Sequence, residues 1–232
     1  MEKIFNLDEI AVAESLNTKG YAVVKRVLSP IDSKNLWSQY QNEELYRSTI
    51  DMQRYRFGQG EYKYFNYPLP ALIQTLRESD YPTLAIIAND WMTKLELPIR
   101  YGSEHHTFLK ACAARGQSRP TPLILRYEKG GFNTLHQDIY GEIFFPFQVV
   151  FVLTQHGIDH EGGEFVLTEQ IPRAQSRVHV LQPNQGDAVI FTTNFRPVKG
   201  TKGYYRANMK HGVSEVKSGI RYSLGIIFHD AI

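Results

Sequence analysis

The sequence predicts an α+β fold in which a mainly helical N-terminal half packs on a β-rich C-terminal half. Residues 1–120 carry helix-capping residues and apolar side chains at helical spacing, whereas residues 121–232 contain short β-branched and aromatic runs separated by glycine, proline and asparagine. No internal repeat, low-complexity tract or linker separates the two halves. We therefore expect one domain, 1–232, with a helical portion at 1–120 and a β-rich core at 121–232.

Three helices are predicted in the N-terminal half. Ser29 supplies an N-cap hydroxyl, Pro30 suits the first helical position and Asp32 can reach back to the cap, so a helix is expected over 29–46. A second helix is expected from Pro82 onward and a third over 103–116. The second has one apolar face, formed by Leu84, Ile87, Ala88, Trp91 and Leu95.

The C-terminal half contains seven predicted strands, which are bounded by turn residues. They are Leu123–Lys129, Ile143–Thr154, Glu164–Glu169, Arg177–Leu181, Asp187–Thr193, Lys210–Val216 and Arg221–His229. Short strands at this spacing are typical of a β-sandwich or a barrel.

Composition restricts the environment of the protein. The longest apolar run, 143–153, is interrupted by Pro146 and Gln148 and is shorter than the roughly 20 residues of a membrane-spanning helix. Residues 1–10 mix acids with apolar side chains and do not resemble a signal peptide. Cys112 is the only cysteine, so no internal disulfide can form. We expect a cytoplasmic protein without a membrane partner.

Positive charge is concentrated in one stretch, although the net charge of the chain is only +2. No acid occurs between Ala188 and Ser214, and five cations lie there: Arg196, Lys199, Lys202, Arg206 and Lys210. A solvated basic loop over 196–210 is the default interpretation. Because this loop runs directly into His211, nucleic acid is also a candidate partner.

Histidine beside carboxylate is the chemical feature that remains after common motifs are excluded. The chain has no glycine-rich nucleotide-binding motif, no G-x-S-x-G, no H-E-x-x-H and no paired C-x-x-C. His136-Gln-Asp138 is its only H-x-D, and in an extended strand residues two apart point to the same face. His211, on a later predicted strand, can supply a third ligand. Two histidines and one carboxylate form the facial triad of non-haem Fe(II) oxygenases.

Arg221 begins the last apolar strand, ten residues after His211. An arginine at this place is expected to be half buried, and a buried guanidinium needs an anionic partner. A dicarboxylate co-substrate that chelates iron at one end presents its far carboxylate to such a fork.

These residues resemble the ligands of a known superfamily. His136, Asp138, His211 and Arg221 look like the iron and 2-oxoglutarate ligands of Fe(II)/2-oxoglutarate-dependent dioxygenases, and the segment 123–131 resembles the prolyl-hydroxylase-like strand that ends in tyrosine before a glycine turn. Over nearly its whole length the chain is similar to a bacterial family of uncharacterised 2OG-Fe(II) oxygenases. Action on damaged nucleic acid has been suggested for that family.

The resemblance implies a fold, cofactors and residue roles. The C-terminal half is expected to be a double-stranded β-helix, or jelly roll, that holds Fe(II) through His136, Asp138 and His211. The co-substrates are expected to be 2-oxoglutarate and O₂, with oxidative decarboxylation to succinate and CO₂ coupled to hydroxylation of a substrate C–H bond. Arg221 would bind the far carboxylate of 2-oxoglutarate, with Tyr127 and Ser223 as hydrogen-bond donors.

Other functions stay open at this point. A catalytically inactive cupin-like binding module has the same shape, and a zinc-dependent hydrolase uses a similar ligand set but needs a general base near the metal. For an oxygenase, the reaction is hydroxylation or oxidative demethylation, and the substrate is alkylated nucleic acid, a protein side chain or a small metabolite. Tyr62, Tyr64 and Phe65 are the aromatic cluster nominated to stack an unpaired base.

Overall fold

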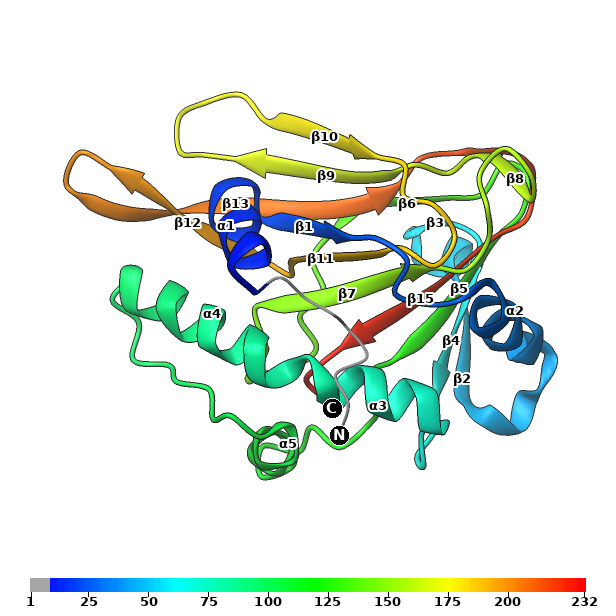
Figure 1. The fold of residues 1–232 in the computed structure, drawn as a ribbon, viewed down its shortest axis with the longest axis horizontal. Helices are drawn as coiled ribbons and strands as arrows, with labels where there is room; N and C mark the ends of the chain where they lie inside the picture. The colour runs from blue at the N-terminus through cyan, green and yellow to red at the C-terminus, as the bar shows by residue number, and fades with distance from the viewer. Residues whose placement is uncertain (1–8) are drawn as a thin grey trace.

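The computed structural model describes residues 9–232; residues 1–8, which make up most of the stretch tested for a signal peptide, lie outside the described residues. Two antiparallel sheets lie face to face in this part of the chain, and helices cover the outer face of the larger one (Figure 1). The α+β expectation is confirmed, and the strands of the two sheets pair in antiparallel fashion. No helix of the described residues is long and apolar enough to cross a bilayer.

The larger sheet has seven strands in the order β1-β11-β7-β15-β5-β4-β2. Their bounds are β1 Tyr21–Val24, β2 Tyr46–Asp51, β4 Glu61–Phe65, β5 Leu123–Tyr127, β7 Phe147–Val152, β11 Ala188–Thr192 and β15 Arg221–Ile227. Three of the seven come from the N-terminal half, so that half is not a purely helical layer. Every residue of β7 is buried, because helices cover one face of this strand and the smaller sheet covers the other.

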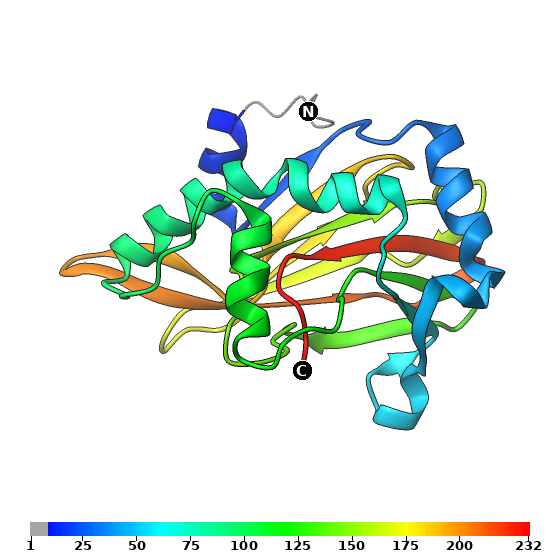
Figure 2. The same cartoon turned by 90° about the horizontal axis from the view of Figure 1, so that it is seen from below.

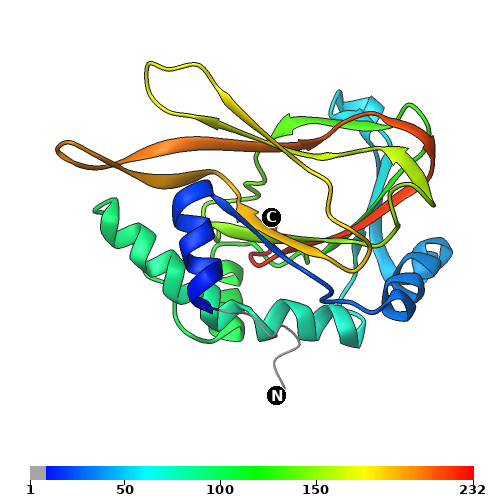
Figure 3. The same cartoon turned by 45° about the horizontal axis from the view of Figure 1, so that its top comes forward.

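The smaller sheet has the order β10-β9-β13-β6-β3, and β12 pairs with β13. Its strands are β3 Gly58–Gln59, β6 Phe132–His136, β9 Phe165–Gln170, β10 Arg177–Leu181, β12 Phe195–Gly200 and β13 Gly203–Val213. A short separate pair joins β8 His160–Gly162 to β14 Val216–Gly219. Figure 3 shows the smaller sheet above the larger one. Apolar side chains of β7 and β11 form one buried cluster with those of β9 and β13.

Helices pack across the outer face of the larger sheet (Figure 2). They are α1 Glu9–Lys19, α2 Pro30–Ser38, α3 Ala71–Ser79, α4 Tyr81–Lys94 and α5 His105–Ala113. The apolar face predicted for the second helix is the buried face of α4, where the Trp91 ring lies 4.6 Å from that of Phe147 on β7. The short helices α1 and α3 were not predicted.

The predicted helix over 29–46 is correct at its start and wrong at its end. The Ser29 hydroxyl accepts a hydrogen bond from the backbone N–H of Asp32 at 3.0 Å, as an N-cap does. The α-helix ends at Ser38, and two 3₁₀ turns, η1 Gln39–Gln41 and η2 Glu43–Leu45, follow before β2. The first of these turns buries Tyr40.

The basic loop predicted over 196–210 is a β-hairpin made by β12 and β13. Arg196 is only 9% exposed and forms an ion pair with Glu169 at 2.6 Å, so its charge is neutralised inside the fold. Lys199 and Lys202 lie at the hairpin turn. Because a strand rises by about 3.4 Å per residue, the nine residues from Lys202 to His211 place this turn about 30 Å from His211. Only the end of the basic stretch next to His211 therefore lies near His211.

Candidate functional site

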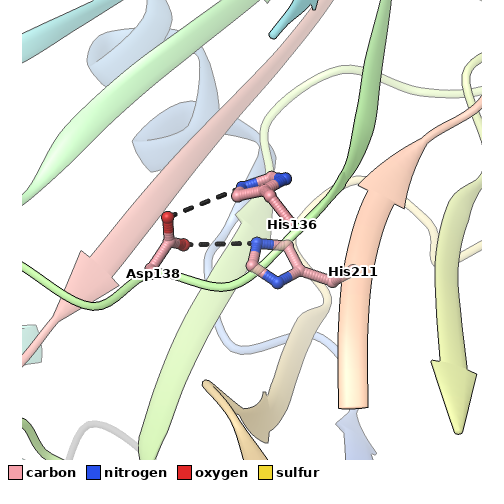
Figure 4. Close-up of side chains that lie close together, drawn as sticks. All are labelled: His136, Asp138 and His211. Carbon is pink, nitrogen blue, oxygen red and sulfur yellow. Dashed lines mark ion pairs between the residues drawn. The ribbon is translucent and has the colours of Figure 1, made fainter. Parts of the chain in front are cut away.

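Adjacent strands bring the two predicted histidine ligands together. His136 and His211 are direct partners in the pairing of β6 with β13, and their ring centroids lie 4.2 Å apart. His136 is the last residue of β6, so Asp138 lies in the loop beyond the strand rather than on it. The sequence-based placement of both residues on one strand face is wrong for Asp138, although the two side chains still converge (Figure 4).

The three side chains form one compact cluster. Nε2 of His211 lies 3.2 Å from one oxygen of Asp138, and Nε2 of His136 lies 3.5 Å from the other. One ligand atom from each residue falls within 4.8 Å of the others, which is a separation that a single metal ion can bridge. Two imidazoles and one carboxylate on the same side of a cavity fit Fe(II), because the opposite positions remain open to other ligands.

Hydrogen bonds from neighbouring residues orient this cluster. His136 donates from Nδ1 to the carbonyl oxygen of Thr134 at 2.7 Å, which leaves its Nε2 free to coordinate. Tyr140 donates its hydroxyl to Asp138 at 2.6 Å. The loop itself is fixed by Gln137, whose amide donates to the carbonyl oxygens of Asn194 and Met209 at 2.9 and 2.8 Å. Sequence reasoning missed Gln137, because its partners are distant in the sequence, and it missed Tyr140 although Asp138 is only two residues away.

Electrostatics hold the cluster in the protonation state that binds a cation. Burial would raise the pKa of Asp138, but hydrogen bonds from His211 and Tyr140 and electrostatic interactions with the two histidines outweigh it and hold this pKa well below its usual range. Burial lowers the pKa of His211, which favours the neutral imidazole needed for coordination. Burial and the charge of Asp138 raise the pKa of Tyr140 well above its usual range, so the phenol keeps the proton it donates.

A cavity of ≈ 200 Å³ opens between the two sheets and contains the cluster in its wall. Strands of both sheets line it with mostly apolar side chains, including Leu125, Val149, Phe165 and Phe191. Apart from Asp138, no aspartate or glutamate of the described residues lines this cavity. A zinc-dependent hydrolase would need a second carboxylate here as its general base, so the cavity disfavours that alternative.

Arg221 lines the same cavity and is 2% exposed. It is therefore more deeply buried than the half-buried position expected from the sequence. Within residues 9–232, its side chain has a single hydrogen-bond acceptor, the hydroxyl of Ser223 at 3.1 Å, and no carboxylate within ion-pair distance. A buried guanidinium with so few partners is costly, and an anion bound in the cavity would offset that cost.

Other buried polar atoms in the cavity wall also lack partners. Among the described residues, neither the hydroxyl of Tyr127 nor the amide nitrogen of Gln148 forms a hydrogen bond of standard geometry. The ring of Tyr127 lies 5.8 Å from the Arg221 guanidinium, and burial raises the pKa of Tyr127 to about 12. The three residues predicted to bind 2-oxoglutarate, Arg221, Tyr127 and Ser223, thus face one space with the metal-binding cluster. Their donors suit a ligand with several oxygen atoms.

The predicted aromatic cluster is divided by the fold. Tyr62 lines the cavity, but Phe65 points into the core and packs against Tyr46 with ring centroids 4.8 Å apart. Tyr64 is buried and lies outside the cavity lining. Tyr62 and Tyr64 are two residues apart and share one face of β4, where their ring centroids lie 5.4 Å apart, whereas Phe65 points to the opposite face. The aromatic residue that sequence reasoning missed is Phe57, which lines the cavity beside Thr134.

Several solved structures share the fold of this chain. A prolyl-4-hydroxylase from Pseudomonas putida superposes with a TM-score of 0.54 at 14% identity, covering 97% of this chain and 99% of its own. An oxidoreductase of the 2OG-Fe(II) oxygenase family from Burkholderia pseudomallei gives 0.54 at 15% identity, covering 98% and 94%. At these identities the likeness shows a shared fold, that of the 2OG-Fe(II) oxygenases.

Sequence comparison identifies the family. The model of the Oxygenase-NA family, described as an oxygenase catalysing oxidative methylation of damaged DNA, matches residues 60–231. Two proteins of Mycobacterium tuberculosis, the uncharacterized proteins MT2286 and Rv2227, are each 44% identical over 167 residues, which are 72% of this chain and 72% of each relative. The chain belongs to the Oxygenase-NA family, a 2OG-Fe(II) oxygenase-like family.

Proposed function

We propose that this protein is a non-haem Fe(II)- and 2-oxoglutarate-dependent dioxygenase with a jelly-roll core. It couples the decarboxylation of 2-oxoglutarate to succinate with hydroxylation, or oxidative demethylation, of a second substrate. One observation carries the proposal: the His136–Asp138–His211 cluster and the buried, unpaired Arg221 face the same cavity. Fe(II) in the cluster would supply the redox chemistry that activates O₂.

The residues of the chain have separate tasks in this proposal. His136, Asp138 and His211 hold the metal on one side, and Tyr140 keeps the carboxylate in place. Arg221 binds the far carboxylate of 2-oxoglutarate as a charge-assisted fork, with Ser223 and Tyr127 as further hydrogen-bond partners. The apolar cavity wall excludes water from the bound co-substrate.

The description of the family favours one class of substrate, whereas the proteins that share the fold act on different classes. The family description refers to damaged DNA, whereas a fold neighbour from Trichoplax adhaerens is a prolyl hydroxylase in complex with a peptide fragment. We favour nucleic acid, with a protein side chain or a small metabolite as the other outcomes. The cytoplasm remains the expected compartment, because the single cysteine, Cys112, is free and buried.

Anaerobic titration tests the metal and co-substrate assignment. Addition of Fe(II) and 2-oxoglutarate to the wild type should produce a weak visible metal-to-ligand absorption band, which Zn(II) cannot produce. His136→Ala, Asp138→Ala and His211→Ala should each lose the band in this titration and lose succinate release in a separate assay with O₂, while keeping the circular dichroism of the fold. Wild-type absorption in any of these variants would remove that residue from the ligand set.

Activity assays with O₂ separate the oxygenase from the binding module and from the zinc-dependent hydrolase. An inactive binding module would release no succinate with any substrate, even if it bound 2-oxoglutarate. A zinc-dependent hydrolase would be active with Zn(II) in the absence of 2-oxoglutarate. Either result would overturn the proposed function.

A further inference from the structure

Two exposed aromatic rings border the mouth of the cavity. Tyr55 and Phe57 are 57% and 45% exposed, and their rings stack with centroids 5.5 Å apart and planes inclined by 20°. Phe57 is also part of the cavity wall. Large aromatic side chains at this exposure leave an unsatisfied apolar surface next to the metal-binding cluster, and such a surface is typical of a binding site.

The position of these rings is fixed relative to His136. The carbonyl oxygen of Phe57 accepts hydrogen bonds from both the backbone N–H and the hydroxyl of Thr134, each at 2.8 Å. The carbonyl oxygen of Thr134 in turn accepts the hydrogen bond from His136. Gly58 pairs with Asn133 so closely that a Cβ at Gly58 would collide with the carbonyl oxygen of Phe132. The aromatic pair is thus tied to a predicted metal ligand through one residue.

The turn that presents the rings is itself anchored. It is formed by η3, Met52–Tyr55, and by Arg56 in a left-handed conformation. Met52 is fully buried, and its carbonyl oxygen accepts the backbone N–H of Phe57 at 3.0 Å. The rings therefore lie on a preformed surface, which reduces the entropy lost when a ligand binds.

Cations alternate with the aromatic residues along this turn, in the order Arg54, Tyr55, Arg56, Phe57, and all four side chains are exposed. Arg54 lies 3.8 Å from Asp51 in a solvent-exposed pair, which is a weak interaction that a phosphate can replace. The cations at the β12–β13 hairpin turn lie about 30 Å from His211 along the strand. Arg54 and Arg56, by contrast, are immediate chain neighbours of the aromatic pair.

We propose that the Arg54–Phe57 turn is a stacking platform that receives an unpaired base of single-stranded nucleic acid. The base stacks on the Tyr55–Phe57 pair at the cavity mouth, and Arg54 and Arg56 contact the flanking phosphates. Alternating aromatic and cationic side chains match the alternation of bases and phosphates along a strand, whereas a peptide has no such regular charge. This inference rests on the proposed function, because it assigns the substrate class of the same cavity.

Binding of a fluorescent single-stranded oligonucleotide, measured without turnover, tests the platform. Base–aromatic stacking contributes about 1–3 kcal/mol per base, so Tyr55→Ala and Phe57→Leu should each weaken binding about five- to hundredfold. Phe57→Trp should restore it, because the aromatic face is retained. An oligonucleotide of abasic sites should bind weakly and should be insensitive to Phe57→Leu, since it has no base to stack.

Salt dependence tests the two arginines. Each phosphate contact on a single strand contributes about −0.7 to the slope of log affinity against log salt, so Arg54→Ala/Arg56→Ala should make the slope shallower by about 1.4. Lys199→Ala/Lys202→Ala is the matched control, because it also removes two exposed cations but from the remote hairpin. This control should leave the slope unchanged.

Three outcomes would overturn the platform. They are no oligonucleotide binding at about 50 mM salt, an equal loss in the hairpin control, and binding of an unstructured peptide with the same dependence on Phe57. Fe(II) and 2-oxoglutarate absorption in the same samples separates the two proposals. If the absorption band forms but the oligonucleotide does not bind, the platform fails and the oxygenase assignment stands. If binding depends on the platform but no band forms, the oxygenase assignment fails.

Discussion

Strand β15 meets a buried arginine at each end, and the two arginines have opposite environments. At the end of the strand, Arg77 from α3 is fully buried and forms an ion pair with Asp230 at 2.7 Å. It also donates to the carbonyl oxygens of Ile227 and Phe228 and to the hydroxyls of Tyr67 and Thr121. At the start of the strand, Arg221 is equally buried but donates only to the hydroxyl of Ser223.

This difference supports a structural role for Arg77 and the binding role proposed for Arg221. A guanidinium has five N–H donors on three nitrogens, and each of the three nitrogens of Arg77 donates to an acceptor supplied by the fold. Arg221 has the same donors in a cavity whose acceptors are missing. Because the fold would gain from pairing Arg221, its unpaired state indicates that a ligand completes the site.

Removal of Arg77 should have the largest effect on stability. Arg77→Met leaves Asp230 buried without its partner, so the free energy of unfolding should fall by about 3–5 kcal/mol. Urea denaturation followed by circular dichroism measures this loss. The double variant Arg77→Met/Asp230→Asn should recover part of it, because the uncompensated charge is then removed. A loss below about 1 kcal/mol, the range of an exposed pair, would show that the Arg77 network does not hold this end of β15.

Arg221 should show the reverse pattern. Arg221→Met should weaken 2-oxoglutarate binding about ten- to hundredfold, since a charge-assisted hydrogen-bonded pair contributes about 1.5–3 kcal/mol. Its free energy of unfolding should equal or exceed that of the wild type, because an unpaired buried charge is removed. Fe(II) affinity without co-substrate should stay constant. Loss of stability with unchanged 2-oxoglutarate affinity would make Arg221 a structural residue like Arg77.

The sequence was sufficient to nominate the metal-binding residues but not what holds them. His136, Asp138 and His211 follow from one motif and one strand assignment. Gln137 orients the motif through Asn194 and Met209, which are 57 and 72 residues away, and no local pattern encodes such pairings. Phe57 likewise reaches the cavity only because β3 pairs with β6, which begins more than 70 residues later.

The same limit applies to the two arginines. Arg221 was found because it begins an apolar strand at a suitable distance from His211. Arg77 was missed, because its partner Asp230 lies 153 residues away and the helix that carries it has no cap signal at Pro70. For the β12–β13 hairpin, the sequence overestimated the free positive charge. It counted Arg196 as a free cation, but Arg196 forms an ion pair with Glu169.

A smaller effect on Fe(II) affinity is expected from the loss of a tyrosine hydroxyl that donates to a buried aspartate. Tyr140 donates to Asp138 at 2.6 Å, and Tyr67 donates to Asp230 at 2.9 Å. Tyr140→Phe should weaken Fe(II) binding about tenfold, since the hydrogen bond that orients a ligand is lost. Tyr67→Phe is the matched control and should leave Fe(II) affinity unchanged. Equal Fe(II) affinity in both variants would show that Tyr140 does not position Asp138.

The pH dependence of stability should be governed by histidine near Arg77. Burial, and then the charge of Arg77, lower the pKa of His105 to about 3, while its imidazole shares a hydrogen bond of 2.8 Å with the carbonyl oxygen of Phe228. In the unfolded chain this pKa is about 6.5, so between pH 6.5 and 3 the unfolded state binds a proton that the folded state does not. Stability is therefore complete above pH 6.5 and falls with decreasing pH, by about 1.4 kcal/mol per unit for one such group. His105→Gln should reduce the slope of unfolding free energy against pH by about one proton, and His106→Gln, which alters an exposed neighbour, should not. An unchanged slope in His105→Gln would show that this imidazole is protonated in the folded state and that the Arg77 end of β15 tolerates the additional charge.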